Sequence, residues 1–511
     1  MRLFRVGRDG ASISVFQGVL AMGYDLFNDI ESEARKRLSE FPDGRHVAIS
    51  LGDMEVTYPE LLERAGGLSG VFRRLFRAER PRVALVGPDG PGYVASALGI
   101  LGAGGVFVSA GKEISPDDFS GLLEKMSVDV AVVEEELARR LAPAYFEDGA
   151  AVTAFGEVYR VFVRSGAAPD FPGEEEFNSL NPAFARFSSG TTGARKGVAL
   201  SHESIRDRTD AADSAFALSP GERVLWLMPM AHHFAATINL FLRRGCVIDV
   251  SSGGSSAESA ERLRGGECSF VYATPWHYLE MARADTGAPR ELPDSVRLLV
   301  STAMALSPNV SELFEERFGR CLNQAYGIIE CGIPCVNLEP ERDGVFSVGK
   351  PVGGHEARTD APDGLSEGEV LLRGPGFFDA YLRPWIERAS VLDSGWFRTG
   401  DIGVFSETGA LSIVGRRKSL INFMGLKIFP EKVEPVLNAL PGVRESRVFG
   451  ENHPAYGEMP VAEIAPDNSA SPPNTVELTR LCRERLSTHE IPQEFRIVRY
   501  IPKTPSGKVR R

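Results

Sequence analysis

The sequence predicts an α/β protein with a large N-terminal domain of helix-covered, mostly parallel sheets and a small α+β C-terminal domain. Three observations lead to this prediction. The 511 residues exceed what one hydrophobic core usually holds, so two or more domains are expected. Short β-branched runs alternate with helical segments over most of the chain, which favours parallel strands covered by helices. Beyond residue 427 the pattern changes to that of a small α+β module.

The elements of the large domain follow from hydrophobic periodicity. Residues 82–87 predict a buried strand, 91–101 a helix and 106–108 the next strand. Further strands are predicted at 128–133, 184–187, 223–228, 245–250, 270–274 and 297–301. Because ligands of such folds bind at the carboxyl ends of parallel strands, the loops that follow these strands are where a binding site is expected.

Composition excludes some partners. The chain has 57 Lys and Arg against 69 Asp and Glu, and its net charge of -12 disfavours binding to nucleic acid or to anionic lipid. Two long uncharged stretches, 91–111 and 224–242, contain glycines or a proline with two histidines. We therefore expect both to belong to the core, and we expect no membrane span.

The cysteines indicate a reducing compartment. There are six in the chain, and they form no CxxC pair or common zinc pattern. Residues 1–9 also carry charges where a secretory signal would need apolar residues. Both observations favour a cytoplasmic protein with reduced thiols.

A loop of hydroxyls and glycines follows the strand predicted at 184–187. Its residues are Ser188, Ser189, Gly190, Thr191, Thr192 and Gly193, and Lys196 comes soon after. Small side chains, bare N–H groups and a lysine are suited to wrap phosphate oxygens. A Walker loop is excluded, because Lys196 is followed by Gly197 and Val198 instead of Ser or Thr. The alternative is a solvated turn.

This loop resembles the phosphate loop of the adenylate-forming superfamily, which includes acyl-CoA synthetases, firefly luciferase and the adenylation domains of peptide synthetases. The resemblance implies ATP and Mg²⁺ as cofactors. It also requires later segments to supply, in order, a metal carboxylate, a ribose anchor, a hinge and a second lysine.

The segment 324–330, at the end of another predicted strand, resembles the superfamily's Tyr-Gly-x-Thr-Glu motif. Tyr326 can stack on a purine while its hydroxyl stays hydrated. Glu330 can bind Mg²⁺, which prefers carboxylate oxygen. A core aromatic residue and a surface acid are the alternatives. Ile329 replaces the threonine, so one hydroxyl contact worth about 1 kcal/mol is expected to be missing or replaced.

A second departure precedes this motif. Residues 300–306 stand where members of the superfamily usually have a glycine-rich Ser-Gly-Gly-Ala-Pro-Leu run beside the adenine and the acyl group. In the segment from Thr302 to Ala305, residues with larger side chains stand where the superfamily has glycines. We expect a narrower or reshaped pocket, which affects the choice of substrate more than the class of reaction.

The paired histidines His232 and His233 lie in the segment 228–234. Adjacent side chains face apart on regular structure, so a shared metal is not favoured. The resemblance implies that His232 lines the acyl pocket, whereas a hydrogen-bonded structural histidine is the alternative. Residues 228–242 contain no acid to pair with a substrate ammonium group. A carboxylic acid without an α-amino group is therefore favoured.

The segment 395–401 ends in Thr-Gly-Asp. The carboxylate of Asp401 can accept hydrogen bonds from both ribose hydroxyls, and Arg416 adds a forked donor towards ribose or phosphate. An ordinary turn is the alternative.

The segment 415–427 resembles the hinge between the superfamily's two domains. The resemblance places Lys418 at the hinge and Gly425 beside the thiol tunnel. It implies a large nucleotide- and acyl-binding domain at 1–415 and a small mobile domain at 416–511. In the small domain we expect helices at 430–437 and from Asn474, the second with a capping box formed with Glu477, and strands at 446–449 and 461–464.

The last motif, 501–508, resembles the superfamily's Pro-x-Thr-x-x-Gly-Lys loop. The resemblance gives Lys508 the role of the lysine that bridges the substrate carboxylate and the α-phosphate. The alternative is a solvated charge near a chain end.

These motifs together predict an enzyme that activates a carboxylic acid with ATP, releases pyrophosphate and transfers the acyl group to a thiol. Coenzyme A is the favoured acceptor, because the chain stops after the small domain and 450–458 resembles the acyl-CoA synthetase version of it. The alternative is transfer to a separate acyl or peptidyl carrier protein or to an amine. A non-catalytic nucleotide binder is least favoured, since it would need neither Lys508 nor a hinge.

Overall fold

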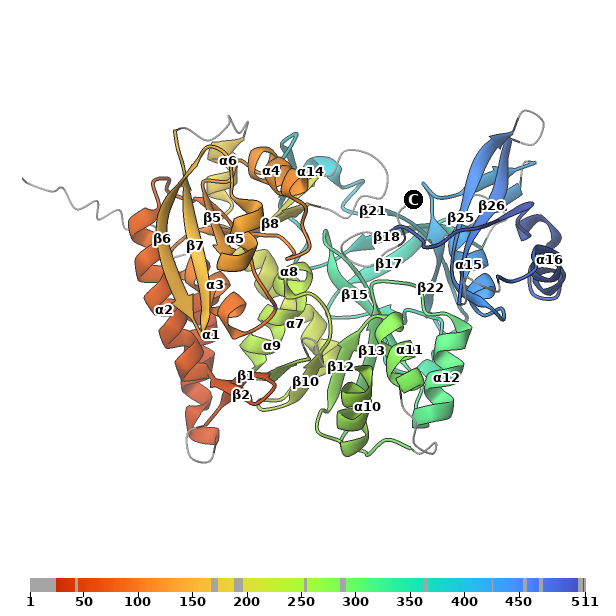
Figure 1. The fold of residues 1–511 in the computed structure, drawn as a ribbon, viewed down its shortest axis with the longest axis horizontal. Coiled ribbons are helices and arrows are strands. Elements are labelled where there is room, and N and C mark those ends of the chain that lie inside the picture. The colour runs from red at the N-terminus through yellow and green to blue at the C-terminus, as the bar shows by residue number, and fades with distance from the viewer. Residues whose placement is uncertain are drawn as a thin grey trace, which may run out of the picture.

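The computed structural model shows a large lobe and a separate C-terminal domain (Figure 1). It describes residues 24–41, 45–166, 173–187, 196–251, 255–284, 291–361, 366–424, 426–453, 457–467, 472–503 and 509.

The first large sheet has nine strands in the order β16-β15-β14-β13-β12-β10-β11-β1-β2. Its strands are β1 Val47–Leu51, β2 Met54–Thr57, β10 Arg223–Trp226, β11 Val247–Val250, β12 Phe270–Ala273, β13 Leu298–Thr302, β14 Asn323–Ile328, β15 Gly332–Asn337 and β16 Lys350–Pro351. The strands from β14 through β1 pair in parallel, whereas β2, β15 and β16 are antiparallel at the two ends.

The second large sheet also has nine strands, in the order β20-β19-β9-β8-β4-β3-β5-β7-β6. Its strands are β3 Arg82–Val86, β4 Val106–Ser109, β5 Val130–Glu134, β6 Phe146–Ala154, β7 Glu157–Arg164, β8 Pro182–Phe187, β9 Gly197–Ser201, β19 Ala380–Tyr381 and β20 Ile386–Glu387. The four central strands are parallel and the others are antiparallel. The predicted parallel sheets are therefore confirmed in their centres, and antiparallel strands extend both.

Helices cover the sheets, as the alternating pattern predicts. They are α1 Leu26–Arg37, α2 Tyr58–Leu75, α3 Pro91–Gly102, α4 Pro116–Lys125, α5 Glu135–Leu141, α6 Glu174–Ser179, α7 His202–Phe216, α8 Met230–His233, α9 Asn239–Arg244, α10 Ser256–Gly265, α11 Pro275–Ala284, α12 Pro308–Phe318, α13 Pro340–Asp343 and α14 Arg388–Val391, with the short turn η1 Leu38–Glu40 and a π-helical turn η3 Phe234–Ile238. Burial of eleven of the twelve residues of α3 confirms the uncharged stretch 91–111 as core.

Three hydrophobic clusters hold the large lobe together. The main cluster joins residues of both sheets, for example Leu85 of β3 and Ile248 of β11, with α2 and α3. A second cluster packs α4 and α5 onto one sheet, and a third packs α10, α11 and α12 onto the other. Among the described residues, no helix is both long enough and apolar enough to cross a membrane.

A third, four-stranded antiparallel sheet adjoins the C-terminal domain, and the sequence did not predict it. Its strands are β17 Glu356–Asp360, β18 Gly368–Arg373, β21 Phe397–Phe405 and β22 Leu411–Arg416. β17 alternates charged and half-buried residues, so it lacks the apolar run by which the buried strands were found. This sheet carries Asp401 and Arg416.

The C-terminal domain is an α+β module with its own core, as predicted. It contains β23 Ile421–Phe423, β24 Leu426–Ile428, β25 Val443–His453, β26 Gly457–Pro466, β27 Glu494–Ile497, α15 Pro430–Asn438, α16 Thr475–Arg483 and η4 Thr488–Glu490. Val433, Val448, Ile464 and Leu478 are among its core residues. Helix α15 contacts β22 and α12 of the large lobe.

One predicted detail of this domain is wrong. The side chain of Asn474 caps α16 by accepting a hydrogen bond from the N–H of Val476, but no capping box forms. The carboxylate of Glu477 instead pairs with Arg480 one turn further on, at 2.7 Å. An ion pair on the helix surface has drawn Glu477 away from the cap.

Candidate functional site

Tyr326, Asp401 and Arg416 form one contiguous group, although they come from two sheets. Tyr326 lies on β14 of the first sheet, and its hydroxyl donates a hydrogen bond to Asp401 on β21. Asp401 faces Arg416 across the β21–β22 ladder, and Arg416 Nε lies 2.8 Å from Asp401 Oδ1. The carboxylate, which is only 2% exposed, is therefore held between a neutral and a cationic donor.

These contacts change the ionisation of both donors. The Asp401 carboxylate raises the pKa of Arg416, against the opposing effect of burial. Burial, followed by the charge of Asp401, raises the pKa of Tyr326 well above its ordinary value. The sequence did not predict that the Tyr326 hydroxyl donates to a protein carboxylate, because the unpredicted third sheet brings Asp401 within hydrogen-bonding distance.

The Thr-Gly-Asp motif lies within strand β21 and is not an isolated turn. The N–H of Asp401 donates to Thr399 Oγ1 at 3.0 Å, and the Thr399 hydroxyl donates to the carbonyl of Val370. Gly400 has a φ of 74°, a left-handed conformation that favours glycine. Pairing with β18 and with β22 is irregular around this motif. The irregularity fits a bulge that redirects a functional side chain.

Glu330 and Lys196 meet at the ring of Tyr381. The Tyr381 hydroxyl donates to Glu330 Oε1 at 3.3 Å, and Lys196 Nζ lies 4.4 Å from the centre of the same ring. Tyr381 is on β19, which pairs with β9 directly after Lys196. Burial raises the pKa of Glu330, whereas Tyr381 and the nearby arginines Arg416 and Arg208 lower it. Sequence reasoning missed Tyr381, since a two-residue strand has no local pattern.

Arg208 of α7 supports the segment that carries Glu330. Its guanidinium donates two hydrogen bonds to the carbonyl of Gly376, at 2.9 and 2.6 Å, and one to the carbonyl of Ile329 at 3.0 Å. Burial lowers the pKa of Arg208 to about 10. Sequence reasoning missed this residue too, although a signal existed: Arg208 is charged and lies on the same helical face as Ile205 and Ala212, which are buried.

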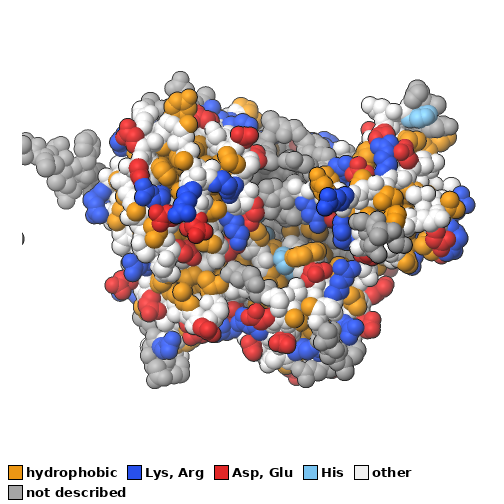
Figure 2. All heavy atoms as spheres, viewed as in Figure 1, with side chains coloured by type: hydrophobic (Ala, Val, Ile, Leu, Met, Phe, Trp, Pro, Cys, Tyr) orange, Lys and Arg blue, Asp and Glu red, His pale blue; other side chains and the backbone are white. Residues whose placement is uncertain are grey.

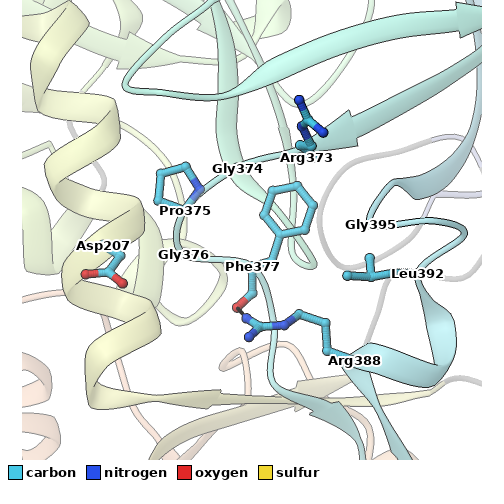
Figure 3. A pocket seen from close by; sticks show the side chains of 9 residues that line it. All are labelled: Asp207, Arg373, Gly374, Pro375, Gly376, Phe377, Arg388, Leu392 and Gly395. Carbon is cyan, nitrogen blue, oxygen red and sulfur yellow. Dashed lines mark hydrogen bonds between the residues drawn. The ribbon is translucent and has the colours of Figure 1, made fainter.

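A surface pocket of about 350 Å³ lies on the loop that Arg208 holds (Figure 3). It is lined by Asp207, Arg373, Gly374, Pro375, Gly376, Phe377, Arg388, Leu392 and Gly395. Arg373 is already paired with Glu356, and Arg388 donates to the carbonyl of Phe377. None of the residues predicted for the site lines this pocket.

His232 and His233 point in different directions, as expected for neighbours. The ring of His233 packs edge-on against Trp226 and Tyr272, with centroids 5.5 and 6.1 Å apart. His232 Nε2 lies instead near Gly111, since a Cβ built there would be 3.5 Å from it. The chain continues from α8 into the π-helical turn η3, a rare local structure that often occurs at functional sites.

A second cavity, of about 250 Å³, lies beside α8. It is lined by Asp89, Lys112, Glu113, Trp226, Leu227, Met228, Pro229, Val250, Ser251 and His277. His277 Nδ1 is hydrogen-bonded to the Thr274 hydroxyl at 2.8 Å, and burial lowers the pKa of His277 to about 4. The carboxylate of Asp89 accepts a hydrogen bond from the N–H of Met230 at 2.6 Å, so the cavity wall and the start of α8 are tied together.

The segment that departs from the glycine-rich pattern ends β13. Thr302 is the last strand residue, and its hydroxyl donates to the carbonyl of Ala325 at 2.9 Å. Ala303 has a φ of 69°, which alanine rarely adopts. The conformation that suits a glycine is therefore kept, although this chain has alanine there.

Several predicted residues lie outside the described residues: Ser188, Ser189, Gly190, Thr191, Thr192, Gly193, Gly425 and Lys508. The two ends of the hydroxyl-rich segment are described, and Phe187 of β8 pairs with Gly197 of β9. Lys418 lies exposed in the turn between β22 and β23. Figure 2 shows that the molecule is hollowed between the large lobe and the C-terminal domain, and that the acidic and basic side chains coloured there are interspersed.

The two parts of the chain match two family models. Residues 35–382 match the AMP-binding enzyme family, and residues 432–508 match the AMP-binding enzyme C-terminal domain. The two matches, one to each part of the chain, place it among the adenylate-forming enzymes. The chain belongs to the AMP-binding enzyme family, and it is an AMP-forming acid–thiol ligase of the acyl-CoA synthetase type. The predicted resemblance is confirmed.

Curated relatives and solved structures match this chain over most of their length. The chain is 27% identical over 496 residues to the putative acyl–CoA ligase YdaB of Bacillus subtilis, covering 93% of this chain and 96% of that one. It is 31% identical to the sulfoacetate–CoA ligase of Cupriavidus necator over 342 residues, 65% of this chain and 66% of that one. The o-succinylbenzoate CoA synthetase of B. subtilis in complex with its acyl-adenylate has the same fold, with a TM-score of 0.77 at 19% identity, covering 95% and 97% of the two chains.

Proposed function

We propose that this enzyme converts a carboxylic acid and ATP into an acyl-adenylate and pyrophosphate, and then transfers the acyl group to the thiol of coenzyme A. The observation that carries the proposal is the convergence of two groups on one segment. Tyr326 contacts Asp401, and Glu330, four residues further on, contacts Tyr381 beside Lys196. A ribose anchor and a phosphate-binding group are thereby supported at neighbouring positions.

The roles of the nucleotide-binding residues follow from their chemistry. The ring of Tyr326 stacks on the purine, and Asp401 accepts hydrogen bonds from the ribose with Arg416 beside it. Lys196 and the segment Ser188 to Gly193 bind the phosphates. Lys196 fits this role, because its ammonium group lies over the Tyr381 ring with no ion pair among the described residues.

The donor set fits Mg²⁺. Glu330 is a carboxylate whose pKa burial raises, and the hydrogen bond it accepts from a described side chain comes from Tyr381, an uncharged group. A buried carboxylate without a cationic partner is costly, and a hard divalent ion prefers such an oxygen. When bound, Mg²⁺ would neutralise charge on the phosphate oxygens.

The adenylation step needs positioning and positive charge more than acid–base chemistry. A carboxylate oxygen of the acid forms a bond to the α-phosphorus, and the bond from that phosphorus to pyrophosphate breaks. Lys508 bridges the acid and the α-phosphate in this step, and Lys196 stabilises the charge that develops on the phosphates. His232 lines the acyl pocket. Its position next to the cavity of about 250 Å³ supports this role.

The thioester step requires the small domain to turn. We assign residues 1–415 to the large domain and 416–511 to the small one, with Lys418 as the hinge. The exposed turn that holds Lys418 supports this boundary, since little packing would resist its rotation. Rotation of the small domain would withdraw Lys508 and bring Gly425 to the path of the thiol. The thiol then attacks the acyl carbonyl and expels AMP.

Coenzyme A is the acceptor because curated relatives that match almost the whole chain are named as CoA ligases. Transfer to a carrier protein or to an amine is the alternative. The six free cysteines, five of them buried, support a cytoplasmic location.

The proposal is tested by incubating the chain with ATP, Mg²⁺ and a library of carboxylic acids, with and without coenzyme A. We expect pyrophosphate release that depends on the acid, and an acyl-CoA thioester only when coenzyme A is present. Release of pyrophosphate without any thioester would support adenylation and would show that the acceptor is not coenzyme A. ATP binding without pyrophosphate release from any acid would overturn it.

A further inference from the structure

Arg186 places a guanidinium group in an otherwise apolar layer of the large lobe. On strand β8 its side chain lies on the same face as that of Phe184, since side chains alternate along a strand. Phe184 belongs to an aromatic cluster with Phe107 and Phe234. The centroid of the Phe107 ring lies 5.4 Å from that of Phe184 and 5.0 Å from that of Phe234. A charged residue at this position of a core strand requires a reason, because buried arginines are normally paired.

The described part of the chain supplies only part of the binding partners that this guanidinium needs. Arg186 Nη1 donates to the carbonyl of His232 at 2.5 Å, and among the described residues no carboxylate forms an ion pair with Arg186. A guanidinium has five N–H donors in a planar fork, so most of them remain available to a ligand.

The position of Arg186 is deep, yet its side chain keeps some accessible surface. Burial lowers the pKa of Arg186 to about 10, while Tyr93 and Glu330 raise it. The guanidinium is therefore near both the Tyr93 phenol and the carboxylate proposed to bind the metal. Arg186 is only partly buried, so part of its side chain stays accessible to a ligand.

A buried polar group of α3 packs against the same aromatic cluster. The hydroxyl of Tyr93 on α3 has no hydrogen-bond partner among the described residues, and Tyr93 is only 1% exposed. Burial raises the pKa of Tyr93, Asp89 raises it further, and the charge of Arg186 lowers it. The Tyr93 ring packs edge-on against Phe107 and Phe234, with centroids 6.2 and 6.5 Å apart, so it belongs to the aromatic cluster that Arg186 adjoins. A neutral donor and a cationic donor on one cluster are a combination suited to an anion.

We propose that Arg186, with the Tyr93 hydroxyl, binds a second anionic group on the acid substrate, so that the enzyme selects short acids that carry a carboxylate or sulfonate besides the reacting carboxylate. This inference rests on the proposed function. The spacer must be short, because Arg186 touches the backbone of His232, beside which the acyl group is expected to bind. The charged group of the substrate would take the place that a protein carboxylate usually has beside a buried arginine.

The experiment measures acid-dependent pyrophosphate release by the full chain for acids matched in length. Malonate is compared with propanoate, and succinate and 3-sulfopropanoate with butanoate. We expect the wild type to prefer the dianionic member of each pair by about tenfold or more in kcat/KM. Arg186→Met keeps the apolar stem and removes the charge. It should lower kcat/KM for the dianionic acids by about 10²-fold and leave that for the monoanionic acids equal or higher.

Two further variants separate recognition from folding. Tyr93→Phe removes only a hydroxyl and should reduce the preference for dianionic acids by about five- to tenfold without a change in the KM for ATP. Arg206→Met, on the outer side of α7, removes the same charge and should leave the preference unchanged. Its guanidinium pairs with Asp207.

The outcomes distinguish a failure of the Arg186 inference from a failure of the proposed function. An equal loss for all acids in Arg186→Met, or a rise in the KM for ATP alone, would assign Arg186 to the nucleotide phosphates and overturn the inference while the proposed function stands. A wild type that prefers monoanionic acids would do the same. Absence of pyrophosphate release with every acid would overturn both.

Discussion

The Tyr326 hydroxyl donates a hydrogen bond to the Asp401 carboxylate, and this bond joins two sheets whose strands are far apart in the chain. Tyr326 comes from β14 and Asp401 from β21, while Arg416 of β22 pairs with the other carboxylate oxygen. The carboxylate is thus fixed in place by two donors. A group that is oriented in advance loses less entropy when its ligand binds.

We expect Tyr326→Phe to raise the KM for ATP about three- to tenfold, because the ring that stacks remains and one hydrogen bond is lost. Asp401→Ala should lower kcat/KM for ATP by about 10²-fold, since it removes the buried acceptor and leaves Arg416 without its carboxylate partner. Acid-dependent exchange of labelled pyrophosphate into ATP measures both.

The matched control is Asp393→Ala. Its side chain is 61% exposed, and it lies 3.5 Å from Arg398 in an ordinary surface pair, so the KM for ATP should not change. Equal kinetic effects of Asp393→Ala and Asp401→Ala would remove Asp401 from the nucleotide site.

The raised pKa of Glu330 predicts how the enzyme responds to acid. Burial raises this pKa, so the carboxyl becomes protonated at a higher pH than an exposed glutamate would. A protonated carboxyl does not bind a cation. The KM for Mg²⁺ should therefore rise as the pH falls through this pKa, above the ordinary range of glutamate. Without metal, the free energy of unfolding depends on pH in the opposite sense. The contribution of Glu330 to stability is present at low pH and is lost as the pH rises through its raised pKa.

Tyr381→Phe makes this dependence specific. The hydroxyl of Tyr381 lowers the pKa of Glu330, so its removal should move the acid limb of the Mg²⁺ dependence to higher pH, while the ring remains beneath Lys196. Tyr145→Phe, at a side chain that is 77% exposed, serves as the control. If the KM for Mg²⁺ begins to rise at the same pH in Tyr381→Phe and in Tyr145→Phe, the proposed role of Glu330 is contradicted.

Ala303 offers a test of backbone strain. Its φ of 69° costs an alanine about 1 kcal/mol relative to glycine, so Ala303→Gly should raise the midpoint of urea unfolding of the large lobe. Ala305→Gly, two residues on and not among the residues with positive φ, should lower that midpoint or leave it unchanged. Stabilisation by Ala305→Gly as large as that by Ala303→Gly would argue against the strain.

Lys508 is expected to act only in adenylation. Lys508→Ala should lower the rate of pyrophosphate exchange by about 10²- to 10³-fold, as the loss of one preorganised donor does elsewhere. Lys503→Ala is the matched control near the same chain end, because Lys503 forms an ion pair with Glu445 at 2.8 Å. An exchange rate in Lys508→Ala equal to that in Lys503→Ala would exclude Lys508 from the mechanism.

Much of the fold could be predicted from local pattern. The buried strands at 82–87 and 106–108 have continuous apolar runs, and the helix between them is apolar on all sides, so each element was recognisable alone. The third sheet was missed because its strand β17 alternates charged residues, and β19 of the second sheet was missed because it has only two residues. Their positions depend on pairing with distant strands.

The candidate site divides in the same way. Tyr326, Asp401 and Arg416 were identified from motifs, and the structure brings them together. Their roles stay predictions. Tyr381 and Arg208 were missed, since each acts through a contact with a segment more than 50 residues away in the chain. Motifs identify residues that meet the ligand, whereas the residues that hold them in place follow from tertiary packing.

Lys418 tests whether the small domain must turn between the two steps. Proline fixes φ and removes the N–H, so Lys418→Pro should block rotation in the turn between β22 and β23. We expect pyrophosphate exchange to stay within about twofold of the wild type and thioester formation to fall by about 10²-fold, because only the second step needs the new orientation. Lys418→Ala removes the same side chain without restricting φ and should leave both steps intact. If Lys418→Pro slows both steps equally, the turn is needed for folding or for adenylation itself, and the hinge must lie elsewhere.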